Sequence, residues 1–193
     1  MIEDPLLYLG LDIGIRRDST ALSAVYRDFT EEKYFKMWGC RIWTPTIGNP
    51  VNMVTQVQPV LLKLLQEQRI AALAYDPYQM ETTQQWLTEK GFSDVLVPIN
   101  QQTEMTRAAN TLHSQCVEKT FLMFKDPILR SHFHAMVAQH TERGYRIIKQ
   151  KQSKPIDAGI ATAMAVTAAT GETGHIHHPT LSTNHSRSAV MLP

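Results

Sequence analysis

Two aspartates stand at the ends of two apolar runs in this sequence. Asp12 follows the run LLYLGL at 6–11, and Asp76 follows IAALAY at 70–75. An open α/β sheet binds its ligands at the carboxyl ends of parallel strands, so aspartates on neighbouring strands would converge on one crevice. Adjacent strands lie about 4.8 Å apart and paired catalytic metal ions roughly 3.5–4 Å apart, so these carboxylates could share two cations. The pair therefore indicates metal-assisted chemistry on phosphate.

A third aspartate, Asp157, opens the apolar, alanine-rich segment 156–170, which we predict to be the last helix. Magnesium prefers oxygen ligands, keeps several waters and takes a few carboxylates plus substrate phosphate, so aspartate is the residue type that this chemistry needs. With two ions bound, one would activate the attacking water and the other would stabilise the leaving 3′ oxygen.

Each aspartate also has a structural interpretation. A lone buried carboxylate costs several kcal/mol unless it is paired or bound to metal, so Asp12 is the hardest to explain in this way. Asp76 precedes Pro77 and could begin a turn, whereas Asp157 could simply favour a helix N-terminus. The joint placement of all three favours the metal site.

The pattern of apolar residues predicts the elements that must position these side chains. Strands are expected at 6–12, 20–26, 33–43 with a bulge at Gly39, 70–75, 95–98, 121–124 and 145–149. Helices are expected at 51–68, 79–90, 103–118, 126–139 and 156–170. We therefore predict the α/β class, with a mixed sheet of three antiparallel strands followed by parallel strands, flanked by helices.

Composition bounds the protein without revealing its function. The 193 residues are 43% hydrophobic and carry a net charge of +1, so we expect one domain at 1–170 and no global basic field. Cys40 and Cys116 lack metal-ligand spacing and fit a reducing compartment. Neither a membrane span nor a signal peptide is recognisable, which predicts a cytosolic protein without a membrane partner.

The C-terminal segment 171–193 is polar and shows no periodicity, so we predict a mobile tail. It contains four histidines, at 175, 177, 178 and 185. No cysteine or carboxylate of fixed geometry accompanies them, so we interpret them as solvated residues and not as metal ligands.

The order of elements, with an aspartate at each of three positions, resembles the ribonuclease H-like nucleases and integrases. Longer strings narrow the resemblance to the C-terminal nuclease domain of large terminase subunits from tailed bacteriophages. These strings are LGLDIGIRRDSTALS, AYDPYQMETTQQWLTEKGF, TEMTRAANTLHSQ and RIIKQKQSKPIDAGIATAMA, in the order of the family, over about residues 6 to 170.

The resemblance implies specific roles for four residues. Asp12 matches the metal ligand of the first strand, Asp76 the ligand of the fourth strand, and Asp157 the aspartate of the I-D-A segment. Asp18 stands where many members carry an acidic residue before Ser or Thr, so it is either a further metal carboxylate or an ordinary turn residue. The implied cofactors are Mg²⁺ or Mn²⁺, with two ions.

The sequence departs from the full family pattern because it contains no G-x-x-x-x-G-K-[ST] motif, so no Walker nucleotide site is expected. We interpret the chain as an isolated nuclease domain or one split from its motor. The implied partners are double-stranded DNA, the terminase ATPase domain, the small terminase subunit and the portal, in the cytoplasm of an infected bacterial host.

Basic residues gather before Asp157. Lys149, Lys151 and Lys154, with Arg143 and Arg146, form the densest basic run, and Arg16 and Arg17 follow Asp12. Such side chains could contact DNA phosphates, or could equally be a solvated strand and loop.

We therefore predict a metal-dependent endonuclease that cuts double-stranded viral DNA during genome packaging. A Holliday-junction resolvase, or another nuclease of the same superfamily, would use the same aspartates on a branched substrate. A sugar-kinase or actin-like ATPase would require a longer chain, with a second domain. A silent DNA-binding module is unattractive because carboxylates without metal repel phosphate.

Overall fold

The computed structural model describes residues 4–14, 18–28, 34–100, 104–142, 144–151 and 153–171. A six-stranded mixed sheet, in the order β5-β4-β1-β2-β3-β6, forms its centre. Its strands are β1 (Leu7–Asp12), β2 (Thr20–Asp28), β3 (Tyr34–Trp43), β4 (Ile70–Tyr75), β5 (Leu96–Pro98) and β6 (Phe121–Leu122). The antiparallel β1–β2–β3 unit, followed by the parallel strand β4 beside β1, confirms the predicted sheet.

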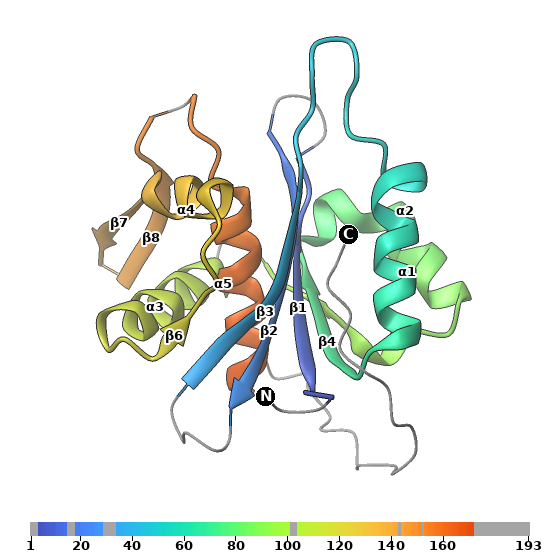
Figure 1. Cartoon of the computed structure of the whole chain (residues 1–193), viewed down its shortest axis with the longest axis horizontal. Coiled ribbons are helices and arrows are strands. Elements are labelled where there is room, and N and C mark those ends of the chain that lie inside the picture. Colours follow the sequence, from blue (N-terminus) through green and yellow to red (C-terminus); the bar gives the residue numbers. More distant parts are fainter. Residues whose placement is uncertain are drawn as a thin grey trace.

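Helices cover both faces of this sheet (Figure 1). One side carries α1 (Gln58–Glu67), preceded by the π-helical turn η1 (Met53–Val57), and α2 (Pro77–Glu89). The other side carries α3 (Glu104–Val117), α4 (Pro127–His134) and α5 (Asp157–Thr170). A short 3₁₀ turn, η2 (Ser93–Val95), leads into β5. Strand β1 therefore has to be apolar on both faces.

The predicted bulge lies on β3, next to the glycine that suggested it. Ala24 pairs with Gly39 and Val25 pairs with Met37, which leaves Trp38 as the extra residue. A bulge of this kind increases the local twist of a strand.

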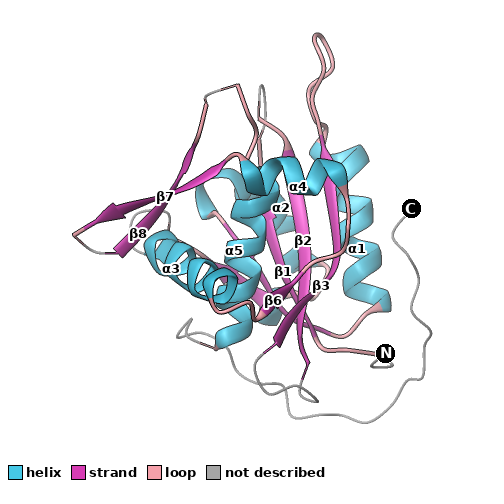
Figure 2. Cartoon of the chain, turned by 60° about the vertical axis from the view of Figure 1, so that its left-hand side comes forward, coloured by secondary structure: helices cyan, strands magenta, loops and turns pink. Residues whose placement is uncertain are grey.

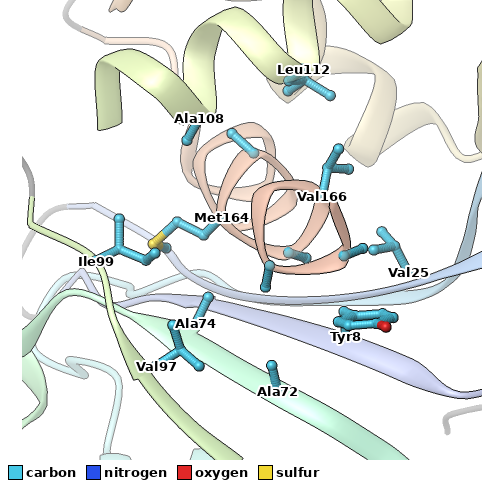
Figure 3. Close-up of a cluster of buried hydrophobic side chains, with 14 of the residues drawn as sticks. Tyr8, Val25, Ala72, Ala74, Val97, Ile99, Ala108, Leu112, Met164 and Val166 are labelled. Atoms are coloured by element: carbon cyan, nitrogen blue, oxygen red, sulfur yellow. The ribbon is translucent and has the colours of Figure 1, made fainter. Parts of the chain in front are cut away.

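Helix α5 lies directly on β1 because Gly10 has no side chain. A Cβ atom at Gly10 would lie 1.9 Å from the carbonyl oxygen of Ala161. The alanines of α5 allow this approach, and the helix is buried between the sheet and α3 (Figure 3). Tyr8, Ala72, Ala74 and Val97 from the sheet pack on this side, together with Ala108 and Leu112 of α3. The contact between Gly10 and Ala161 fixes the position of α5 along the first strand.

A second apolar cluster fills the opposite face of the sheet. Leu9 and Leu11 of β1 alternate with Tyr8 and Gly10, so they point toward α1 and α2. They pack with apolar residues of both helices, among them Leu61, Leu64, Met80 and Leu87.

The region around 134–149 differs from the prediction. The helix expected to run to Gln139 ends at His134, and Met136–Thr141 forms the strand β7 instead. β7 pairs antiparallel with β8 (Gly144–Lys149), so the predicted edge strand belongs to a separate hairpin and not to the main sheet. Figure 2 shows this hairpin beside α3, projecting from the body of the molecule. Tertiary pairing overrides the local helical pattern here, since β8 offers β7 a complete hydrogen-bonding partner.

No helix within the described ranges is both long and apolar enough to cross a membrane. Of the predicted tail at 171–193, residues 172–193 lie outside the described residues.

Candidate active site

Asp12 and Asp76 lie side by side at one end of the sheet. Leu11 pairs with Tyr75 across the parallel strands β1 and β4, and each aspartate is the next residue in its strand direction. Neighbouring strands are about 4.8 Å apart, so the two backbones bring their carboxylates to the same edge. This is the juxtaposition expected from the two apolar runs.

Asp157 reaches the same edge from the first turn of α5. The helix crosses β1 where Gly10 meets Ala161, and this contact places Asp157 above the end of the strand. The side chain is 5% exposed, and its Oδ2 accepts a hydrogen bond from the backbone N–H of Ser19 at 3.1 Å. The loop between β1 and β2 therefore holds the start of α5.

Asp18, the residue with two interpretations, lies close to this group. Its Oδ1 accepts a hydrogen bond from Nζ of Lys149 at 2.5 Å, and its side chain is 56% exposed. Lys149 is the last residue of β8, so this ion pair joins the hairpin to the site. Of the predicted DNA contacts, Lys149 forms an ion pair with an aspartate of this group.

The carboxylates of this group influence one another electrostatically. The pKa of Asp12 is raised to about 8, first by burial and then by the negative charges of Asp157, Asp76 and Asp18, while Lys149 opposes the shift. Burial also raises the pKa of Asp157, against the influence of Lys149 and of the Ser19 N–H. Among the described residues that act on Asp12, three carboxylates raise its pKa and one lysine lowers it.

Asp76 has the structural role that its place before Pro77 suggested, at the start of a turn. It is the N-cap of α2, and its Oδ1 accepts a hydrogen bond from the N–H of Tyr78 at 3.0 Å. The side chain is 5% exposed. A cap occupies one oxygen of a carboxylate, so the turn role and a metal role are compatible at this residue.

The residues fit a hard divalent cation by chemistry and by charge, but they do not form a closed cage. Within the ranges that the structure describes, no group of three or more His, Cys, Asp or Glu side chains is arranged to hold a metal ion. These side chains make other contacts, since Asp76 caps a helix, Asp18 pairs with Lys149 and Asp157 accepts from Ser19. Magnesium usually takes one or two carboxylates and completes its shell with water and phosphate.

The other predicted basic residues are less closely associated with the aspartates. Lys151 and Lys154 are exposed in the loop that leads to α5, and the N–H of Lys154 bonds to the carbonyl of Lys151 at 3.0 Å. Arg146 is exposed on β8. Arg16, Arg17 and Arg143 lie outside the described residues.

Two residues at the site were not anticipated from the sequence. The backbone of Ser19 binds Asp157, and Nδ1 of His132 accepts a hydrogen bond from the N–H of Ala158, the residue after Asp157. His132 is 26 positions away from Ala158, and no local pattern marks it as a partner of α5. Burial lowers the pKa of His132, which favours its neutral form.

The sheet order and the flanking helices define a ribonuclease H-like fold, as expected from the sequence resemblance. Solved structures with a similar fold include large terminases. The HK97 bacteriophage large terminase superposes with a TM-score of 0.71 at 21% identity, over 86% of this chain and 41% of that one. This chain thus spans less than half of the length of that protein.

Isolated nuclease domains match over most of their length. The large terminase nuclease from the thermophilic phage G20c, in a structure with bound magnesium, gives a TM-score of 0.61 at 15% identity, covering 85% of this chain and 82% of that one. The g2p nuclease domain from bacteriophage SPP1, with bound Mn, gives 0.57 at 12% identity, covering 84% and 86%. No family model and no curated protein matches the sequence. The predicted resemblance is thus confirmed at the level of the fold.

Proposed function

We propose that this chain is a divalent-metal-dependent endonuclease that hydrolyses double-stranded DNA, acting on concatemeric viral DNA during phage genome packaging. The observation that carries the proposal is the position of Asp12 next to Asp76 at the carboxyl ends of β1 and β4, where burial and the charges of Asp157, Asp76 and Asp18 raise its pKa to about 8. Repulsion between these carboxylates disfavours the charged form of Asp12. A bound cation would turn it into attraction.

The proposal assigns Asp12, Asp76 and Asp157 as metal ligands and Asp18 as an outer ligand. Two Mg²⁺ or Mn²⁺ ions would supply activation of water and stabilisation of the leaving 3′ oxygen. The fold's likeness to nucleases that were solved with magnesium and with Mn supports this choice of ions. The protein's own part is to hold the carboxylates on rigid elements, with Ser19 orienting Asp157 from the neighbouring loop.

The DNA backbone would approach over the basic side chains next to the aspartates. Lys149 reaches Asp18 from β8, and Lys151 and Lys154 are exposed in the segment between β8 and α5. We propose these lysines as phosphate contacts, together with Arg16 and Arg17 from the loop after Asp12. Contacts of this kind position the duplex without reading its sequence.

The biological setting follows from the likeness to large terminases and belongs to the same proposal. The partners would be double-stranded DNA, a terminase ATPase domain, the small terminase subunit and the portal. The place of action would be the cytoplasm of the infected bacterial host.

The decisive experiment is plasmid cleavage by the purified chain with Mg²⁺, with Mn²⁺ and with EDTA. We expect nicking and linearisation only with a divalent ion, and no need for ATP. Cutting that continues in excess chelator would refute the metal-dependent assignment. A parallel assay with a four-way junction separates this function from a resolvase, which would prefer the branched substrate to linear duplex.

A further inference from the structure

Helix α5 begins without a cap of its own. The first four N–H groups of an α-helix have no partner inside the helix, and Ser, Thr, Asp or Asn usually supplies one at the N-cap. Here the N-cap is Ile156, which makes no side-chain hydrogen bond to the helix. The first turn nevertheless carries Asp157, whose orientation matters for the proposed metal site.

A histidine from another helix takes the place of the missing cap. The N–H of Ala158 donates to Nδ1 of His132 at 3.2 Å, and the N–H of Gly159 donates to the carbonyl of Ile156 at 2.8 Å. His132 lies in the last turn of α4 and is 2% exposed. A ring nitrogen that accepts a hydrogen bond carries no proton, so the proton of this neutral imidazole is on Nε2.

The packing around this hydrogen bond is apolar and close. Ala158 lies in one buried cluster with Leu129 of α4 and Ala161 of α5, and Phe133 packs against it. Water therefore has little access to the Ala158 N–H, and leaving a buried N–H without an acceptor is unfavourable. Without His132 this N–H would have to find another acceptor nearby.

To reach another acceptor, the first turn of α5 would have to shift, and Asp157 lies in that turn. Its carboxylate accepts a hydrogen bond from the Ser19 N–H and is also stabilised by its own backbone N–H. Both contacts depend on where the turn lies relative to β1 and β2. A shift of the turn would therefore displace the carboxylate from its place beside the other aspartates.

We propose that His132 is a positioning residue for Asp157: it caps α5 from α4 and so keeps the first turn, with the Asp157 carboxylate, in place for a divalent cation. This inference rests on the proposed function, since it assigns Asp157 to metal binding. It adds a residue outside the acidic group, on an element that the sequence does not connect to the site.

The test compares two substitutions at this position in the full chain. His132→Leu removes the acceptor and replaces the imidazole with an apolar side chain of similar size. His132→Asn places Oδ1 where Nδ1 stands and so restores the acceptor. The affinity for Mn²⁺, measured by electron paramagnetic resonance without DNA, should fall roughly 10–100-fold in the Leu variant. We expect the Asn variant to stay within about threefold of wild type, well short of that range.

A control separates positioning from general loss of packing. Leu129→Val disturbs the same buried cluster and leaves the hydrogen bond to His132 in place. All variants are compared equally far below their own Tm, and exchange of the Ala158 amide proton is followed by NMR. That amide should exchange faster in the Leu variant alone.

Three results would overturn the inference. These are unchanged Mn²⁺ affinity in His132→Leu, an equal loss in Leu129→Val, or no recovery in His132→Asn. If instead the wild type itself neither binds Mn²⁺ nor cuts DNA, the proposed function fails. In that case the amide exchange still reports whether His132 caps α5.

Discussion

Aspartates at the two ends of the central sheet have opposite electrostatic surroundings. At the end where β2 finishes, Asp28 is 7% exposed and pairs with Lys36 of β3 at 2.6 Å. At the other end, Asp12 faces the carboxylates of Asp76, Asp157 and Asp18, with Lys149 as the counter-charge that lowers its pKa. Both ends belong to the same β1–β2–β3 unit.

The difference separates structural from functional use of a carboxylate. A buried charge is tolerated when a partner of opposite sign accompanies it, as at Asp28. Like charges brought together raise one another's pKa and reduce stability unless something from outside neutralises them. The acidic end is therefore the place where a cation would be expected.

The most direct test of this difference removes one aspartate charge at each end of the sheet. Asp12→Asn should lower cleavage more than about a hundredfold. Losing a residue that only orients a metal ligand usually costs about 10–100-fold, and losing the ligand itself should cost more. Its Tm without metal should equal or exceed that of wild type, since repulsion is relieved. Asp28→Asn should instead keep cleavage and lose about 1–3 kcal/mol of unfolding free energy, since it weakens the bond with Lys36.

Plasmid cutting and thermal melting of both variants check this prediction. The comparison would be wrong if Asp12→Asn lost activity only by unfolding. It would also be wrong if Asp28→Asn lost cleavage at a temperature where it remains folded.

A second substitution addresses how the acidic end is assembled. Gly10→Ala should cost at least about 3 kcal/mol, the upper part of the usual range for overpacking, because the new Cβ would meet the backbone of α5 and not a flexible side chain. Shifting α5 also moves Asp157 away from Asp12. We expect lower Tm together with weaker Mn²⁺ binding. A stable Gly10→Ala protein with unchanged metal affinity would show that α5 does not need this contact.

The pH dependence of the metal-free protein gives a third test. The pKa of Asp12 lies near 8 in the folded chain and near 3.8 as its ordinary value. Between these values the folded state holds a proton that the unfolded state has released, so stability should fall as pH rises from about 4 to about 8. Asp12→Asn should reduce this slope, and Mn²⁺ should reverse it. Melting curves at several pH values would contradict the assignment if both proteins lost stability equally.

The smallest expected effect concerns the exposed ion pair between Lys149 and Asp18. Exposed pairs contribute about 0–1 kcal/mol, so Lys149→Gln and Asp18→Asn should hardly change Tm. Lys149→Gln should weaken DNA binding and reduce its dependence on salt concentration, because a phosphate contact is lost. Asp18→Asn should reduce cleavage less than Asp12→Asn does. Equal losses for Asp18 and Asp12 would make Asp18 a direct ligand.

Local patterns predicted most of the elements because their residues match one periodicity. The runs before Asp12 and Asp76 became β1 and β4, and the three- and four-residue spacing of apolar residues over 51–68 became a helical segment, η1 followed by α1. The segment 135–141 was different. Its residues suit a continuing helix, and only the presence of β8 as a partner makes it the strand β7.

The sequence by itself determined which residue types could do chemistry and on which elements they lie. Aspartates after buried strands carry that information, since strand direction alone brings their ends to one edge of a sheet. Tertiary structure alone decided how α5 meets β1 at Gly10, which charge pairs with Asp18, and which side chain caps α5. These contacts join residues that are far apart in the chain, and a local sequence pattern does not show which distant residues meet in the folded protein.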